Sequence, residues 1–407
     1  MSWIACTLDD ICDKVDGHIQ TGPFGSQLHQ SDYSKVGTPV VMPKDIVNGT
    51  ISEEGIARVS EEHVLRLSRH KVRTGDILFS RRGDVGRCAY ISPKEQGWLC
   101  GTGCLRVTVD AKVADSKFIF YYLQQASAID WIEKHAIGAT MLNLNTGILA
   151  TVPIMLPSLP TQRRIASILS AYDDLIENNR RQIKLLEEAA QRLYREWFVE
   201  LRFPGHESVK VMDGVPEGWM KGTVDNIVKL LSGYPFKSSE YVSSGKYRLI
   251  TIKNVKDGEF SPDNVDYIDQ LPDKVPSHCI LTEGDILLSL TGNVGRVCIV
   301  NGYNYLLNQR VAKLQTLHPA YAYCMFRSKE MLNKMTALSN GVAQQNLSPI
   351  RAEKIRILIP SSNLLFQFKN IVEPIISQII LLNNQITFAC EARDRLLPEL
   401  MDGEMEV

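Results

Sequence analysis

The chain has 407 residues, enough for two or three domains, and its 44% hydrophobic and 22% charged content is typical of a globular protein. It has no run of eighteen apolar residues, and its N-terminus, MSWIACTLDD, is acidic where a signal peptide is positive. These patterns predict a cytoplasmic protein without a membrane span. The formal net charge of −1 conceals a basic segment, residues 219–360, with 17 Lys and Arg against 12 Asp and Glu. Such a segment is compatible with a nucleic-acid partner.

Motifs for catalysis and metal binding are missing. The sequence has no Walker loop, no dinucleotide-binding glycine pattern after a strand, no H-E-x-x-H and no G-x-S-x-G. Cys100 and Cys104 have the spacing of half a zinc site, but no second half follows, which favours ordinary thiols in a reducing compartment. We therefore expect no catalytic residue, metal site or cofactor in this chain.

The dominant feature of the sequence is an internal duplication. Three segments return in the same order, as GDILFSRRGDVGR (75–87) and GDILLSLTGNVGR (284–296), WIACTLDDI (3–11) and WMKGTVDNI (219–227), GATMLNL (138–144) and GVAQQNL (341–347). The offset between copies drifts only from 216 to 203 residues, so the chain consists of two copies of a unit of about 205 residues.

Each copy begins with a part of about 150 residues that Gly, Pro and Asp break into short apolar runs, the pattern of strands and turns. In copy one the expected strands are PVVM (39–42), DILFS (76–80), CAYI (88–91), LRVTV (105–109) and VPIML (152–156). Helical periodicity marks residues 115–125 and, in copy two, residues 320–335. We predict the α+β class. Asp76 and Asp285 each follow a Gly and precede an apolar strand, which indicates a structural role in the turn.

Each copy ends in a long helix of ~50 Å with a narrow apolar seam. Residues 161–198 contain no Gly or Pro, whereas Pro374 predicts a kink or a late start in the second helix, which we place from residue 368. Because so narrow a seam needs a partner, we predict an antiparallel coiled coil within the chain. The alternative is that each helix packs on its own globular part. Asn178-Asn179 and Asn383-Asn384 either fix the helix register or are simply exposed polar residues.

Two sets of seam residues follow from this periodicity. Those expected to pair the helices and dock partner subunits are Ile165, Ile168, Asn179, Ile183, Leu186, Leu193, Ile379, Leu382, Asn384, Ile386 and Leu396. Leu175 and Ile371 are further expected seam positions.

Two globular parts alternating with two long helices, with TGPFGS (21–26), GDILFSRRGDVGR and a Pro-led helix after VPIMLPSLPTQRRI (152–165), resemble the specificity subunit of a type I restriction-modification enzyme. The resemblance covers essentially the whole chain. It departs at the helix starts, where Thr161-Gln162 and Phe366-Gln367 replace the family's usual Glu-Gln. The implied parts, related by a pseudo-twofold axis, are target-recognition domains 1–157 and 219–360, a central helix 158–200, a linker 201–218, and a C-terminal helix with an acidic tail 361–407.

The resemblance also implies a division of labour. Each globular domain would read one half of a split, asymmetric sequence in double-stranded DNA. The helices would dock two methyltransferase subunits that bind S-adenosylmethionine, and motor-nuclease subunits that use ATP and Mg would join them. The chain itself would supply the address and no chemistry.

The repeated phrase changes mainly at its centre, where Arg81-Arg82 becomes Leu290-Thr291. A constant frame with a changed tip is what two readers of different sequences would show, although drift in exposed turns is an alternative. Arginine reads guanine and also contacts phosphate. The candidate DNA-binding residues are Ser26, Gln27, Lys44, Ser80, Arg81 and Arg82 in copy one, and Lys237, Lys253, Asn254, Ser289, Thr291, Asn293, Gln309, Arg310, Gln344 and Gln345 in copy two.

Two alternative functions remain open on the sequence alone, and so does the role of one basic segment. The chain can be a duplicated coiled-coil scaffold that joins proteins without reading DNA, or a DNA enzyme with unrecognised motifs. The basic run RLSRHKVR (66–73) either contacts phosphates or is a solvated face.

Overall fold

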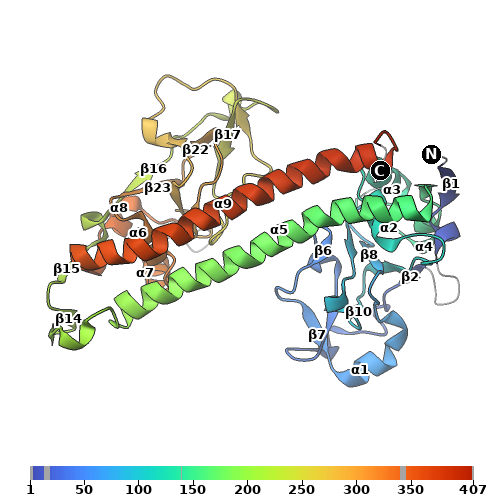
Figure 1. Cartoon of the computed structure of the whole chain (residues 1–407), viewed down its shortest axis with the longest axis horizontal. Helices are drawn as coiled ribbons and strands as arrows, with labels where there is room; N and C mark the ends of the chain where they lie inside the picture. The colour runs from blue at the N-terminus through green and yellow to red at the C-terminus, as the bar shows by residue number, and fades with distance from the viewer. Residues whose placement is uncertain (1–2, 13–18, 139, 340–344, 406–407) are drawn as a thin grey trace. The chain divides into compact units, whose positions relative to one another are not determined.

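The protein divides into two compact units (Figure 1). Unit 1 comprises Met1–Asp174 and Ala389–Val407, and unit 2 comprises Leu175–Phe388. Each of the two long helices therefore contributes one segment to each unit. The structure is a computed structural model that describes residues 3–12, 19–138, 140–339 and 345–405.

Unit 1 is built on two four-stranded sheets. One has the order β2-β11-β8-β9 and is antiparallel throughout, and the other has the order β10-β4-β7-β3, in which β10 and β4 run parallel. Its strands are β1 (Ile4–Thr7), β2 (Ile19–Thr21), β3 (Tyr33–Ser34), β4 (Thr38–Val41), β5 (Ile46–Val47), β6 (Thr50–Ile51), β7 (Ala57–Val59), β8 (Ile77–Ser80), β9 (Cys88–Tyr90), β10 (Leu99–Cys100), β11 (Cys104–Val107) and β12 (Pro153–Leu156). Its short helices are α1 (Glu61–Arg66), α2 (Ser116–Leu123), α3 (Ala126–His135) and α4 (Thr146–Ala150).

Unit 2 repeats this architecture. Its sheet β16-β23-β20-β21 is antiparallel, and its sheet β18-β17-β22-β19 contains the parallel pair β17 and β22. Its strands are β13 (Val211–Met212), β14 (Val215–Pro216), β15 (Met220–Thr223), β16 (Val228–Ser232), β17 (Tyr247–Ile250), β18 (Tyr267–Ile268), β19 (Ile280–Leu281), β20 (Ile286–Ser289), β21 (Val297–Ile299), β22 (Tyr305–Leu307), β23 (Val311–Thr316) and β24 (Arg356–Ile359). Its short helices are α6 (Pro319–Phe326), α7 (Lys329–Leu338) and α8 (Pro349–Glu353).

The predicted α+β class and duplication are confirmed, and the five expected strand segments correspond to β4, β8, β9, β11 and β12. The single helix expected over residues 320–335 is divided into two helices. Residues 320–335 divide into α6 and α7 because Ser328 adopts an extended backbone and its hydroxyl accepts a hydrogen bond from the Met331 amide at 3.2 Å. Ser328 thus starts a new helix as an N-cap.

Segments of the long helices complete both cores. In unit 1, Phe79 of β8 and Phe118 of α2 belong to one buried cluster with Leu169 and Leu400, which come from the two long helices. In unit 2, Ala190 and Phe368 of the long helices share a cluster with the sheet and α6. Because the sheets and the helices bury each other's apolar faces, the helices are part of each unit's core and not spacers alone.

The long helices are α5 (Leu159–Tyr194), which continues as a π-helical turn over Arg195–Val199, and α9 (Ser362–Met401). In unit 1, Arg393 of α9 forms an ion pair with Asp173 of α5 at 2.7 Å. In unit 2, the Asn179 amide donates a hydrogen bond to Gln385 at 3.1 Å. In unit 2 the rings of Trp197 and Phe368 also lie 5.8 Å apart. Residue numbers there rise from 179 to 197 as their partners fall from 385 to 368, so the chain segments pair antiparallel, as predicted. The pseudo-twofold relation stays a prediction.

The expected seam positions divide by burial. Ile165, Asn179, Ile379 and Leu382 are buried, and Ile168, Ile183, Leu186, Leu193, Asn384, Ile386 and Leu396 are partly buried. The prediction that Leu175 and Ile371 lie in the seam is wrong. Their side chains are 43% and 46% exposed, whereas those of their neighbours Ile176 and Val372 are buried.

Two further expectations about the helices need correction. Helix α9 begins at Ser362 and passes through Pro374, so the predicted late start is wrong. The Asn384 amide donates to Glu283 at 2.7 Å and not across the helix pair, so only Asn179 of the expected asparagines makes a hydrogen bond to the partner helix.

Helix α9 is also unusually apolar. An 18-residue window within it has a mean hydropathy of 1.3, which by length and composition alone is enough for a membrane-spanning helix, and 28% of that window is buried inside the protein. The sequence prediction of no membrane span rested on the lack of an unbroken run of eighteen apolar residues, and the polar residues within this window agree with that. Part of this apolar surface lies in the seam, and part of it is open to solvent.

Candidate nucleic-acid interface

Four loops meet at one place in unit 1, and we call residues 21–28, 80–87, 100–104 and 140–144 the unit 1 loop cluster. The turn between β8 and β9 is held by main-chain bonds: the Arg81 amide donates to Gly103 O and the Leu144 amide to Arg81 O, both at 2.8 Å. The Gly22 amide donates to Cys104 O at 2.9 Å. The segment TGPFGS, the turn of GDILFSRRGDVGR and the end of GATMLNL are therefore neighbours in space.

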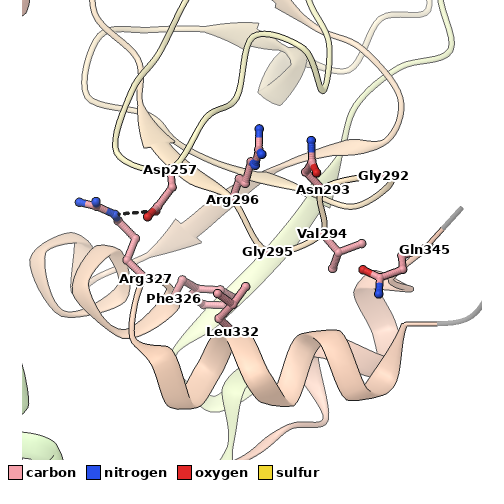
Figure 2. A pocket seen from close by; sticks show the side chains of 10 residues that line it. All are labelled: Asp257, Gly292, Asn293, Val294, Gly295, Arg296, Phe326, Arg327, Leu332 and Gln345. Atoms are coloured by element: carbon pink, nitrogen blue, oxygen red, sulfur yellow. Dashed lines mark hydrogen bonds and ion pairs between the residues drawn. The ribbon is translucent and has the colours of Figure 1, made fainter. Parts of the chain in front are cut away.

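Unit 2 builds the same arrangement from residues 233–237, 289–296, 308–311 and 345–347, the unit 2 loop cluster. The Leu290 amide donates to Arg310 O at 2.9 Å and the Leu347 amide donates to Leu290 O at 2.8 Å. The Gly233 amide donates to Val311 O at 2.9 Å. Each bond matches one in unit 1, so the two clusters share a frame. Figure 2 shows part of the unit 2 loop cluster beside α7.

A glycine in each cluster allows two loops to touch. A Cβ placed on Gly22 would lie 1.9 Å from Gly101 O, and a Cβ placed on Gly233 would lie 2.1 Å from Asn308 O. Any side chain at either position would collide with main chain, so the close approach requires glycine.

The unit 1 loop cluster contains polar side-chain atoms that lack a hydrogen-bond partner. Arg82 is exposed, and Arg81 is half-buried. Among the residues that the structure describes, Arg81 Nε, Thr102 Oγ1 and Asn143 Oδ1 are buried and lack a hydrogen bond. Unsatisfied buried polar atoms are uncommon in folded proteins, so three of them in one loop cluster mark a place where the loops are not packed for stability alone. Thr102 and Asn143 are not among the residues predicted from the sequence. Asn143 was not selected because the matching position of copy two, Asn346, is also asparagine, and the selection favoured residues that differ between the copies.

The unit 2 loop cluster presents a different set of side chains. Asn293, Gln309, Arg310 and Gln345 are exposed. Arg310 has a φ of +72°, and the residue at the matching position of unit 1 is Gly103, with a φ of +87°. A left-handed backbone is costly for a residue with a side chain, and such residues concentrate at functional sites.

Four candidate residues have side chains engaged inside the protein. Ser80 and Ser289 donate to main-chain oxygens of Arg82 and Asn293 in their own turns. Thr291 is 5% exposed and donates to the Asn346 side chain at 3.2 Å.

Asn254 is the fourth and is 3% exposed. Its oxygen accepts from the Thr251 amide at 2.9 Å, and its amide group donates to Ser261 O at 2.9 Å. For all four residues we revise the expected role from contacting DNA to shaping the turn, because their hydrogen-bonding groups are occupied.

Of the remaining candidates, Ser26, Gln27 and Lys237 belong to the loop clusters, and Lys44 and Lys253 lie outside them. Ser26 is exposed, and the Gln27 side chain accepts a hydrogen bond from the Phe24 amide at 3.1 Å. Lys44, Lys237 and Lys253 are exposed, and the Lys44 ammonium donates to Gly55 O at 3.2 Å. Gln344 lies outside the residues that the structure describes.

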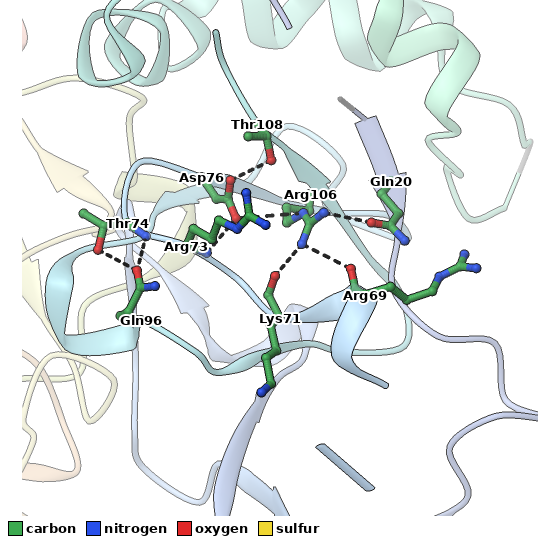
Figure 3. Close-up of polar contacts among 9 residues, drawn as sticks. All are labelled: Gln20, Arg69, Lys71, Arg73, Thr74, Asp76, Gln96, Arg106 and Thr108. Atoms are coloured by element: carbon green, nitrogen blue, oxygen red, sulfur yellow. Dashed lines mark hydrogen bonds and ion pairs between the residues drawn. The ribbon is translucent and has the colours of Figure 1, made fainter. Parts of the chain in front are cut away.

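The repeated Gly-Asp pair belongs to the frame, and Figure 3 shows this for Asp76. The Asp76 carboxylate accepts hydrogen bonds from the Arg73 amide at 2.8 Å and the Thr108 hydroxyl at 2.7 Å. Arg106 lies 3.9 Å away and is itself held by Gln20 at 2.8 Å. Burial raises the pKa of the Asp76 carboxyl, while these partners act in the opposite direction. Such a network fixes the strand below the turn.

Asp285 has the same role in unit 2. Its carboxylate accepts from the Thr282 amide at 2.8 Å and pairs with the Lys313 ammonium at 2.7 Å. Both units keep the aspartate, while its basic partner is Arg106 in unit 1 and Lys313 in unit 2. This supports the predicted structural role of Asp76 and Asp285 in the turn.

Two units with the same loop frame and different exposed side chains, each completed by segments of the two long helices, define a protein with an internal duplication. The chain matches the type I restriction modification DNA specificity domain over residues 2–188 and 216–387, and it belongs to that family. Its role is that of a DNA sequence-specificity subunit, and a scaffold that does not read DNA is not favoured.

Named relatives agree with this assignment. The type I restriction enzyme MjaIX specificity subunit of Methanocaldococcus jannaschii is 26% identical, with 91% of this chain and 87% of the relative covered. The HindI specificity subunit of Haemophilus influenzae is 21% identical, with 83% and 88% covered. The solved structure of a type I restriction-modification S subunit from M. genitalium has the same fold, with a TM-score of 0.60, 17% identity, and 98% and 96% coverage.

Proposed function

We propose that each loop cluster contacts one half of a bipartite, asymmetric target in double-stranded DNA. The observation that carries this proposal is that the same four loops converge in both units on matching main-chain bonds while their exposed side chains differ. A constant frame sets how the loops meet the groove, and the variable side chains set which bases they accept.

The long helices give a physical basis for two half-sites. Helix α5 has 36 residues, so it is ~54 Å long, which exceeds the ~34 Å of one turn of B-DNA. Units carried on such helices can reach half-sites that lie a helical turn or more apart.

The test replaces residues 1–157 with the matching domain of another specificity subunit. We expect one half of the methylated sequence to change and the other half to stay, as mapped by long-read sequencing of methylated DNA. A change in both halves would contradict independent reading by the two units. An unchanged target would remove unit 1 from recognition.

We further propose that exposed apolar residues of the long helices dock two methyltransferase subunits. Leu381 and Phe388 lie seven residues apart on α9 and are 50% and 64% exposed, and Leu185 on α5 is 60% exposed. Exposed apolar residues that gather on one helix mark protein contact sites. Motor-nuclease subunits would join the same complex.

In this proposal the chain is not catalytic. S-adenosylmethionine, ATP and Mg bind the partner subunits, and the complex is cytoplasmic. The described residues contain no group of three or more His, Cys, Asp and Glu placed to hold a metal ion.

Adjacent leucines on α9 give a matched pair of variants for the docking proposal. Leu381 is 50% exposed and Leu382 is 3% exposed. L381D should leave the thermal unfolding temperature unchanged and abolish co-purification of the methyltransferase subunits. L382D should itself destabilise the chain by roughly 3–5 kcal/mol, because it buries an unpaired charge. Full assembly of L381D with the methyltransferase would sink the docking proposal.

A further inference from the structure

The two copies of the repeated turn differ in one acidic residue whose partner is an arginine. In unit 1, the Arg87 guanidinium donates to Asp84, with Nε and Nη2 at 2.9 and 2.8 Å from the same carboxylate oxygen. Its Nη1 donates to Ile46 O at 3.2 Å. Arg87 is therefore held on the protein by three contacts.

In unit 2 the corresponding pair is Asn293 and Arg296, so the carboxylate is missing. Within the described part of the chain, the Arg296 guanidinium has no ion pair and no hydrogen bond. Only its backbone is tied, through its amide to Ser289 Oγ at 3.1 Å. The same fold therefore leaves a cation free in one unit and neutralises it in the other.

Arg296 and Asn293 line a pocket of about 300 Å³ at the unit 2 loop cluster. Figure 2 shows both side chains directed to the same side, away from helix α7. The acid of this pocket, Asp257, is 3.0 Å from Arg327 Nε, and Arg327 also pairs with Glu187. Asp257 and Glu187 are therefore paired with Arg327, and the Arg296 guanidinium is available to bind an anion.

We propose that Arg296 and the Asn293 amide bind a backbone phosphate of the DNA beside the unit 2 half-site. The guanidinium offers planar donors that match phosphate oxygens, and an asparagine amide adds a donor where an aspartate would repel the anion. This inference rests on the proposed placement of a half-site on the unit 2 loop cluster.

The position of Arg296 favours phosphate over a base edge. Arg296 immediately precedes β21, at the foot of the turn, and the Asn293 side chain is directed to the same side as Arg296 (Figure 2). Leu290 and Thr291, at the far end of the turn, are 4% and 5% exposed, so the exposed donors of this turn lie on its flank, where a side chain meets the sugar-phosphate strand beside the groove. The contact should therefore be independent of sequence.

The test measures DNA affinity of the full-length chain in its methyltransferase complex over a series of salt concentrations. The probes are a duplex with the mapped target and a random duplex of equal length. Arg296→Gln should lower the slope of log affinity against log salt by about one on both duplexes, since one phosphate contact contributes ~0.9. Asn293→Asp should do the same, because it recreates the ion pair of unit 1.

Lys221→Gln is the charge-matched control. Lys221 is exposed on β15, which belongs to a different sheet from the turn, so its loss should leave the slope unchanged. A methylphosphonate placed at successive positions of the target should identify one phosphate whose neutralisation abolishes the difference between Arg296→Gln and the natural chain.

Three results would overturn the inference. If Arg296→Gln behaves like Lys221→Gln while Arg310→Ala still weakens binding, the phosphate site is wrong and the loop cluster stands. If Arg296→Gln weakens only target binding, Arg296 reads a base. If Arg310→Ala is also without effect, the placement of the half-site on this cluster fails, and the phosphate site fails with it.

Discussion

The two units have the same loop frame but carry their exposed cations in different places. Unit 1 presents the exposed Arg82 beside the half-buried Arg81 at the tip of the repeated turn, whereas unit 2 has Leu290 and Thr291 there and presents Arg310 from the adjacent loop. Where unit 2 places Arg310, unit 1 has Gly103, and both adopt a left-handed backbone. The frame is held by main-chain bonds, so positive charge can move from loop to loop without disturbing it.

The strongest test of a shared frame uses its close-packed glycines. Gly22→Ala and Gly233→Ala should each lower the free energy of unfolding by roughly 3–5 kcal/mol, because the new Cβ collides with main-chain oxygen. Urea denaturation measures the loss. Gly25→Ala is the control, since a Cβ there meets nothing within 4 Å. A large loss in one unit and none in the other would break the comparison.

Acid stability should distinguish the units next. His70 is buried in unit 1, and the matching residue of unit 2 is Cys279. Burial, and then Arg69 and Arg106, lower the pKa of His70 to about 4. Between pH 6.5 and about 4 the unfolded chain takes up a proton that the folded unit does not, so the stability of unit 1 falls as pH falls. The loss reaches up to roughly 3 kcal/mol.

Hydrogen exchange followed by mass spectrometry reports this difference for each unit separately. Amides of unit 1 should lose protection from pH 6.5 to pH 4 more than those of unit 2. His70→Cys copies the residue of unit 2 and should flatten the dependence. Equal loss in both units, or a dependence that survives His70→Cys, would exclude His70 as its source.

The tip of the repeated turn should matter for unit 1 alone. Replacing Arg81 and Arg82 by Ala should cost ~1–3 kcal/mol in binding and relax one base pair of one half-site if either reads a base. Affinity for every single-base variant of the target is the measurement. Equal weakening on random DNA would assign both arginines to phosphate, and no effect would remove this turn from the interface.

The smallest expected effect is a gain of charge in unit 1. Asp84→Asn removes the carboxylate that holds Arg87 and gives unit 1 the arrangement of unit 2. The salt slope of DNA binding should steepen by about one or less, because an exposed ion pair is weak to begin with. A shallower slope would mean that Asp84 itself supports the DNA-binding conformation.

Sequence analysis predicted the architecture because the order of repeated segments defines the units and the apolar runs define the strands. The helix seam was harder to predict at single positions. Apolar residues stand side by side at Leu175-Ile176 and Ile371-Val372, and a period of 3.6 cannot choose between neighbours. Tertiary packing made that choice, and it also carries α9 through Pro374, where Val372 is fully buried in the core of unit 2.

The interface was less accessible to sequence reasoning. Arg82 and Gln309 are exposed, as a DNA contact requires, but the side-chain burial of Ser289 and Asn254 depends on contacts that no local pattern reveals. Arg296 was overlooked because both copies have arginine at that position. In the described part of the chain, Arg296 lacks an acidic partner because copy two has Asn293 where copy one has Asp84, three residues before the arginine. The difference between the copies is therefore in the acidic partner and not in the arginine.

The open apolar residues of α9 have a consequence for the cell. A chain made without its partners would leave Leu381 and Phe388 in water, a feature by which chaperones and proteases identify orphan subunits. If these residues dock the methyltransferase, as proposed, surplus copies would be removed, and the amount of this subunit in the cell would follow the amount of methyltransferase.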